Sequence, residues 1–511
     1  MRFLSGTMLS RLFGLVRDIA MAAAFGSDPL LAAFFVAFRF ANLPRRLIGE
    51  GAMHSAFIPL FEALRKEDQR RAGLFSRDLL LILGGGLIFF ILLAEGGLYL
   101  IAPAFSAGAR DILDLTRVML PSLLFICLYG INQAYLNCLG VYFLPSAAST
   151  LFNIVWIVGI ALLWDGRGLS QMAALGGVIV IAFCAQWLVT LPQVIRSLKS
   201  SLGGSLFCEL GEGRGDLRSL GRSLLLGIAG VAATQINGVC DSFFSWAADS
   251  SGPAYLWYAI RIQQLPLALF GVALSGALLP PLARAVKSGD VAGYKRFLTF
   301  AHERAIAIMT PTTMLITTLG LAAVNLIYCH GSFTPEAAVK TAHCLVAYGF
   351  GLLPMTLIMI QASAFYAHGD YRTPALASGF SVVVNIIFNA VLVFGFALGP
   401  IAVALSTSLA AYLQSLFLAY RLKREGRGIA LLPLLWMGGK YSFASKVAAT
   451  LTVGLSWWFF GSSPSDLPTA LIPQCLHLAA QTACFAAAFG LVLAVIYGFK
   501  RLVIFAQKKP I

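Results

Sequence analysis

Two similar stretches of sequence decide the fold: residues 37–59 read AFRFANLPRRLIGEGAMHSAFIP, and residues 259–281 read AIRIQQLPLALFGVALSGALLPP. They share an Ala-x-Arg-x-x-x-Leu-Pro motif followed by a glycine and a second proline, and every shared position recurs 222 residues further along. A later pair, Gly140-x4-Pro145 and Gly369-x4-Pro374, recurs at a displacement of 229. A repeat of this length predicts two copies of one structural unit.

The composition places both copies in a membrane. Of 511 residues, 59% are hydrophobic and 12% are charged, so too few polar residues remain to cover a soluble globular surface. Apolar stretches of roughly 20 residues, long enough to cross the hydrocarbon core, recur along the whole chain. They predict about fourteen helices, near residues 5–25, 29–49, 79–103, 112–137, 146–164, 172–194, 223–248, 254–278, 304–328, 338–366, 375–397, 400–420, 441–461 and 472–498.

The repeat and the helices together predict the fold class: an all-α polytopic membrane protein with two pseudo-symmetric six-helix lobes and two further C-terminal helices. Six helices separate the copies, and because six is even, the lobes share one orientation. We expect the first lobe at 1–200, a cytoplasmic linker at 201–222, the second lobe at 223–422 and the last two helices at 440–500. Rocking of one lobe against the other is a simple route to alternating access.

The basic residues follow membrane topology. The formal net charge is +15, but these residues are spread over short connections and not gathered on one face, so nucleic acid is not a predicted partner. The connections after the second, sixth, eighth and twelfth helices and the C-terminal tail are rich in Lys and Arg, and the opposite connections are poor in them. This bias predicts that both termini lie in the cytoplasm.

The first predicted helix carries charged residues inside an apolar span. Arg11, Gly14 and Asp18 share one stripe of the helix, and Ser10, Gly14 and Arg17 share the neighbouring one. An arginine near the bilayer centre costs about 2.5–3.5 kcal/mol, so such residues normally face a bundle interior or an aqueous cavity.

The second helix and its repeat add further cations. Arg39, Asn42 and Arg46 follow helical spacing with Arg45 beside them, and the second lobe offers Arg261. Guanidinium groups pair bidentately with phosphate oxygens, so the pattern predicts an anionic ligand such as a diphosphate. The alternative is that these arginines form internal ion pairs with Asp18 and Glu50, or extend to the membrane interface.

Other polar residues in the spans give weaker signals. Asp241 with Asn237, and Asn385 with Asn389, could form a monovalent cation site or join helices by hydrogen bonds. Glu95 and His477 are isolated, and we expect structural roles for both. The sequence has no P-loop, no paired-carboxylate metal motif and no Ser/His/Asp set, and its nine cysteines lie mostly in apolar runs, so we predict no enzyme activity, metal site or disulfide framework.

Several motifs resemble one known family. They are Ser10-Arg11-x-x-Gly14-x-x-Arg17-Asp18, Ala24-Phe25-Gly26, Asn42, Arg45-Arg46, Glu50-Gly51-Ala52 and Ala56-Phe57-Ile58-Pro59, followed by Gln235-Ile236-Asn237 with Asp241, Tyr258-Ala259-x-Arg261 and Asp370-x-Arg372-Thr373-Pro374. The chain resembles the MurJ (MviN) family of lipid II flippases, of the MOP-type exporter superfamily.

The resemblance implies a central cationic cavity lined by Arg11, Arg17, Arg45 and Arg261, and a lipid-tail groove at the last two helices. It implies a substrate, the undecaprenyl-diphosphate precursor of peptidoglycan, that moves from the inner to the outer leaflet of the bacterial cytoplasmic membrane. It also implies a sodium site; the matching residues are Asp241, Asn385 and Asn389, with Thr407. Acidic positions common in the family are Ala32, Ile260 and Asn389 here.

The sequence thus predicts a lipid II flippase that works by alternating access and is driven by Na⁺ or the membrane potential, without another cofactor. The expected substrate-binding set is Arg11, Arg17, Arg45 and Arg261 with Ser10, Gly14, Asp18, Arg39, Asn42 and Glu50. Three alternatives stay open: an exporter of another lipid-linked oligosaccharide, an exporter of a cationic compound, and a non-transporting scaffold for cell-wall synthesis proteins.

Overall fold

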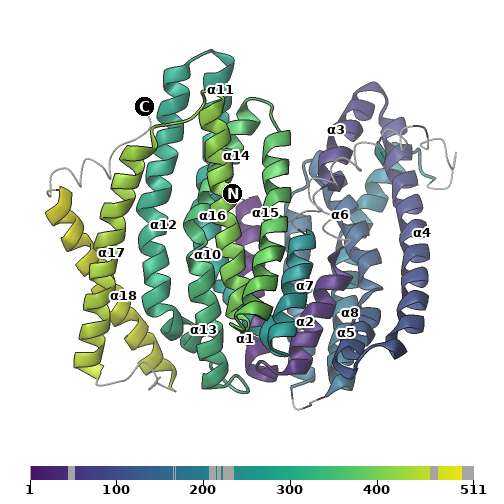
Figure 1. Cartoon of the computed structure of the whole chain (residues 1–511). Helices are drawn as coiled ribbons and strands as arrows, with labels where there is room; N and C mark the ends of the chain where they lie inside the picture. Colours follow the sequence, from purple (N-terminus) through teal and green to yellow (C-terminus); the bar gives the residue numbers. More distant parts are fainter. Residues whose placement is uncertain are drawn as a thin grey trace. The chain divides into compact units, whose positions relative to one another are not determined.

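The computed structural model describes residues 2–43, 52–164, 166, 168–205, 215, 220–221, 235–460 and 470–497, with the backbone alone at 2–8, 52–55, 431 and 456–460. These residues form helices joined by short turns, and no strand occurs among them (Figure 1). The prediction of an all-α fold is confirmed. The chain divides into two compact units, Met1–Phe243 and Phe244–Ile511.

The first unit begins with α1, which packs most extensively on α7. Its helices are α1 (Arg2–Phe25), α2 (Pro29–Ala41), α3 (Ala52–Glu67), α4 (Gln69–Ile101), the short η2 (Ala102–Ala104), α5 (Ala107–Met119), α6 (Ser122–Cys138), α7 (Phe143–Leu162) and α8 (Leu169–Ser201). A further helix at 235–248 contains the boundary between the units.

The second unit repeats this order of helices and adds two. Its helices are α10 (Gly252–Pro266), the π-helical turn η3 (Leu267–Val272), α11 (Ala273–Lys287), α12 (Val291–Tyr328), α13 (Pro335–Gly349), α14 (Leu352–Ala367), α15 (Arg372–Ala390), the π-helical turn η4 (Val391–Gly395), α16 (Ile401–Arg424), α17 (Leu431–Phe460) and α18 (Leu471–Tyr497). The added helices α17 and α18 pack on each other and on α12.

The number of membrane spans is confirmed only in part. In the described part of the chain, nine helices are long and apolar enough to cross a membrane, or ten if α5 and α6, bent by 47° at their junction, form one span. Every predicted span overlaps a described helix or helix pair. The helices that do not pass the test include α1, α2, α17 and the described helix at 235–248, of which α2 and the helix at 235–248 are too short. The chain is therefore a multi-pass membrane protein, and the count of fourteen stays a prediction.

The internal repeat is visible in how the helices begin and end. Gly140, after α6, and Gly369, after α14, both have positive φ, +77° and +75°, a conformation that glycine adopts without steric cost. Asp68 and Asp290 begin α4 and α12, and each side chain accepts a backbone N–H as an N-cap. The same local chemistry therefore shapes both copies.

Each unit has its own apolar core. In the first unit, Phe57 of α3 stacks with Phe61 of the same helix and with Phe75 of α4, and this cluster packs against α6 and α8. In the second unit, Leu282 of α11 and Phe365 of α14 lie fully buried in the cluster that joins them to α12, α15 and α16.

Candidate functional site

Arg17 of α1 is held in a buried polar cluster against α7. Its Nη2 and Nε donate to Oδ1 of Asp18 at 2.7 and 3.1 Å, and its Nη1 donates to Oδ1 of Asn153 at 3.0 Å. Its guanidinium carbon lies 4.3 Å from the centre of the Trp156 ring. Arg17 is 7% exposed and Asp18 2%. We call these four residues the Arg17 cluster.

The Arg17 cluster offsets the cost of burying a permanent cation in an apolar helix. A buried charge must be paired and hydrogen-bonded, and here a carboxylate, an amide and an aromatic face all meet the guanidinium. The internal ion pair with Asp18, which the sequence left open as an alternative, is therefore present. The sequence analysis named neither Asn153 nor Trp156. Two residues with polar side-chain groups three positions apart in an apolar helix would have indicated a buried polar contact.

The same stripe of α1 carries the other predicted residues. Asn153 donates from Nδ2 to the backbone oxygen of Ser10 at 3.2 Å, which ties α1 to α7 about two turns before Arg17. A Cβ built at Gly14 would lie 4.0 Å from Oδ1 of Asn153, an ordinary contact distance. Arg11 is exposed, and no ion pair joins it to the described residues. The two arginines of α1 therefore differ: one charge is neutralised and the other is available.

Arg39 and Asn42 lie at the end of α2. Nη1 of Arg39 donates to the backbone oxygen of Gly238 at 2.6 Å and to Oγ of Ser242 at 2.8 Å, so Arg39 joins α2 to the helix at 235–248. Nδ2 of Asn42 donates to the backbone oxygen of Phe38 at 2.8 Å, within its own helix. Two more predicted residues, Arg45 and Glu50, lie outside the described residues.

Arg261 of α10, the repeat partner of Arg39, has different surroundings. It is half-buried, and its guanidinium carbon lies 4.5 Å from the centre of the Trp257 ring, one turn earlier on the same helix. An aromatic face attracts a guanidinium but does not neutralise it. Arg261 is therefore held on an aromatic face of its own helix.

The residues of the predicted cation site lie in several helices. Asp241 is buried, and Nδ2 of Asn237 donates to its Oδ2 at 3.3 Å. Asn385 and Asn389 are buried one turn apart in α15, and Oγ1 of Thr407 donates to the backbone oxygen of Val403 within α16. The described residues contain no group of three or more His, Cys, Asp or Glu side chains able to hold a metal ion.

Glu95 and His477, for which we expect structural roles, each contact another side chain. Glu95 of α4 accepts from Nε of Arg117 on α5 at 3.3 Å, so it forms an interhelical ion pair. His477 of α18 meets Nε2 of Gln481 at 3.0 Å one turn later. Arg117 lies on a different helix from Glu95, whereas Gln481 follows His477 by four residues on the same helix, a spacing that places side chains side by side.

Comparison with known proteins identifies relatives of the whole chain. The model of the family described as "Lipid II flippase MurJ" matches residues 21–472. The probable lipid II flippase MurJ of Chlamydia muridarum is 33% identical over 96% of this chain and 92% of its own length. That of Rhizobium meliloti is 31% identical over 95% of this chain and 92% of its own length.

Solved structures share the fold. A lipid II flippase MurJ in an inward closed conformation superposes with a TM-score of 0.77 at 22% identity, over 97% of this chain and 98% of that one. An inward-facing multidrug resistance MATE family transporter of the MOP superfamily gives 0.66 at 18% identity, over 83% of this chain and 98% of that one.

Proposed function

Because this chain belongs to the lipid II flippase MurJ family, we propose that it binds the diphosphate of lipid II and moves this lipid-linked precursor from the inner to the outer leaflet of the bacterial cytoplasmic membrane. Transport by alternating access requires no bond to be made or broken, so no catalytic residue is needed. Both termini lie in the cytoplasm in this proposal, as the distribution of Lys and Arg indicates.

Arg11 carries the proposal. It is exposed, stands on an apolar helix and has no counter-ion among the described residues. A diphosphate would supply the missing negative charge through bidentate hydrogen bonds. The sequence adds five further residues to the proposed binding set: Arg39, Asn42, Arg45, Glu50 and Arg261, of which Arg45 and Glu50 lie outside the described residues.

Arg17 has a different role in this proposal. Its charge is already balanced by Asp18, and its hydrogen bond to Asn153 fixes α1 on α7. It is therefore a positioning residue that holds the stripe of Ser10, Gly14 and Arg11 in place. Coupling to Na⁺ at Asp241, Asn385, Asn389 and Thr407, or to the membrane potential, supplies the driving force, because carboxylate, amide and hydroxyl oxygens suit a monovalent cation.

The rate at which Arg11 variants flip lipid II between the leaflets of proteoliposomes tests the proposal. Loss of a charged hydrogen bond worth about 1.5–3 kcal/mol lowers precursor flipping by Arg11→Ala about tenfold or more, and Arg11→Lys retains part of it. The matched control is Arg110→Ala, since Arg110 is also exposed but lies on α5. Equal flipping by wild type and Arg11→Ala would remove Arg11 from the binding site.

A further inference from the structure

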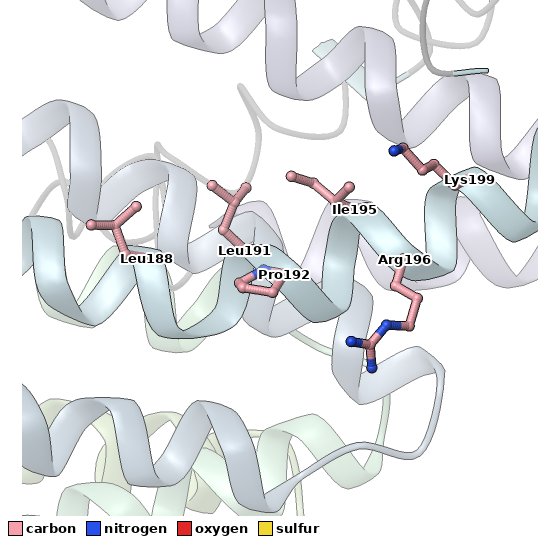
Figure 2. Close-up of a pocket in the computed structure, with 6 residues that line it drawn as sticks. All are labelled: Leu188, Leu191, Pro192, Ile195, Arg196 and Lys199. Atoms are coloured by element: carbon pink, nitrogen blue, oxygen red, sulfur yellow. The ribbon is translucent and has the colours of Figure 1, made fainter. Parts of the chain in front are cut away.

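The exposed face of α8 forms a groove that is apolar along most of its length and basic at one end. A cavity of about 470 Å³ is lined by Leu188, Leu191, Pro192, Ile195, Arg196 and Lys199. Figure 2 shows Leu188, Leu191, Ile195 and Lys199 along one side of the helix, with Arg196 projecting from the other side of the last turn. We call this feature the α8 groove.

The α8 groove is open because the opposite face of the helix makes the core contacts. Thr190, Val194 and Leu198 are buried, and the last two belong to the core of the first unit. Leu188, in contrast, is 48% exposed. In a helix that crosses a membrane, an exposed apolar face is covered by acyl chains, since its leucines and isoleucines cannot face water.

The basic end of the groove favours a lipid with an anionic headgroup. Arg196 and Lys199 are both exposed, and neither forms an ion pair with a described residue. The predicted topology places this end of α8 on the cytoplasmic side, where anionic lipids attract basic residues near the surface. An acyl chain along Leu188 and Ile195 leaves the attached phosphate one to two turns further along, beside both cations.

From these observations we propose that the α8 groove is a binding site for an anionic glycerophospholipid of the cytoplasmic leaflet. The phosphate lies at the basic end of the groove, beside Lys199 and within reach of the flexible side chain of Arg196 three residues earlier, and one acyl chain follows Leu188, Leu191 and Ile195. The residues that line this site include none of the proposed transport residues, and its lipid stabilises α8 without being transported.

Native mass spectrometry of the full-length protein, titrated with phosphatidylglycerol or with phosphatidylcholine of the same acyl chains, tests the proposal. We expect one tightly held phosphatidylglycerol per protein. Each basic residue near the membrane surface contributes about fivefold, so Arg196→Gln/Lys199→Gln weakens phosphatidylglycerol binding about 30-fold and leaves phosphatidylcholine binding unchanged.

Two controls keep the result interpretable. Lys287→Gln/Lys295→Gln removes the same charge from exposed positions on α11 and α12, away from the groove, and retains the tight lipid. Leu188→Ser/Ile195→Ser keeps the charges and weakens binding of long-chain but not of short-chain phosphatidylglycerol. The proposal is overturned if the α8 charge variant binds like the Lys287/Lys295 variant, or if millimolar glycerol 3-phosphate displaces the lipid, because the site would then recognise free phosphate.

Discussion

The Arg17 cluster allows a quantitative prediction about stability. Asp18→Asn removes the only carboxylate within the cluster and leaves a guanidinium that is 7% exposed. Breaking a buried ion pair at one partner costs about 3–5 kcal/mol, because the other charge stays buried. The ring of Trp156 and the amide of Asn153 remain, and the new amide still accepts a hydrogen bond. We therefore expect the lower end of that range, about 3 kcal/mol.

The assay is equilibrium unfolding in mixed detergent micelles, followed by tryptophan fluorescence. Arg17→Met/Asp18→Asn removes both charges and should cost less than Asp18→Asn alone, since no charge is left unpaired. Asp249→Asn is the matched control: Asp249 meets Lys340 at 3.4 Å with side chains 24% and 42% exposed, so its loss should cost under about 1 kcal/mol. If Asp18→Asn destabilises no more than Asp249→Asn, the cluster does not hold α1 in place.

Three further predictions concern single contacts. Asn153→Ala removes a hydrogen bond to a charged group and should cost about 1.5–3 kcal/mol in the same unfolding assay; wild-type stability would show that α1 does not depend on this bond. Gly140→Ala and Gly369→Ala place a side chain at positive φ in open space, so each should cost about 1–2 kcal/mol, and clearly unequal costs would contradict a shared turn geometry. Burial raises the pKa of Asp370, but hydrogen bonds from the side chain and backbone of Thr373 outweigh it and lower this pKa below its ordinary value. The stabilisation is therefore present at neutral pH and is lost as the pH falls through the lowered pKa, which thermal unfolding between pH 3 and 7 should record for wild type and not for Asp370→Asn.

The sequence predicted the fold well because the bilayer imposes simple rules. A span must be apolar and about 20 residues long, so hydropathy located the spans. It did not find where helices continue beyond the apolar stretch: α12 begins at Val291, whereas the predicted span begins at 304, and α3 was not predicted. The repeat of Gly140 at Gly369 was equally informative, because positive φ restricts the choice of residue. The ends of α2 and α3 were less predictable, since a proline after Leu43 and short polar stretches interrupt the pattern there.

For the candidate site, spacing indicated which residues share a helix face but not how their side chains pair. Spacing placed Arg17 and Asp18 on a polar band, yet it could not show that the side chains would pair with each other and with α7. Contacts such as Arg17 with Asn153 join residues 136 positions apart, and such contacts depend on helix packing, which periodicity does not report. The different roles of Arg11 and Arg17 therefore became visible only in the three-dimensional structure.

The most direct test of the central claim is complementation in cells. Depleting a bacterium of its own lipid II flippase and expressing this chain should restore precursor that is accessible to a membrane-impermeant probe at the outer surface. The account predicts restoration by wild type and by Arg110→Ala, and its loss in Arg11→Ala present in the membrane at the same level. Precursor that stays inaccessible while the wild-type chain is folded and inserted would contradict the assignment of lipid II transport to this protein.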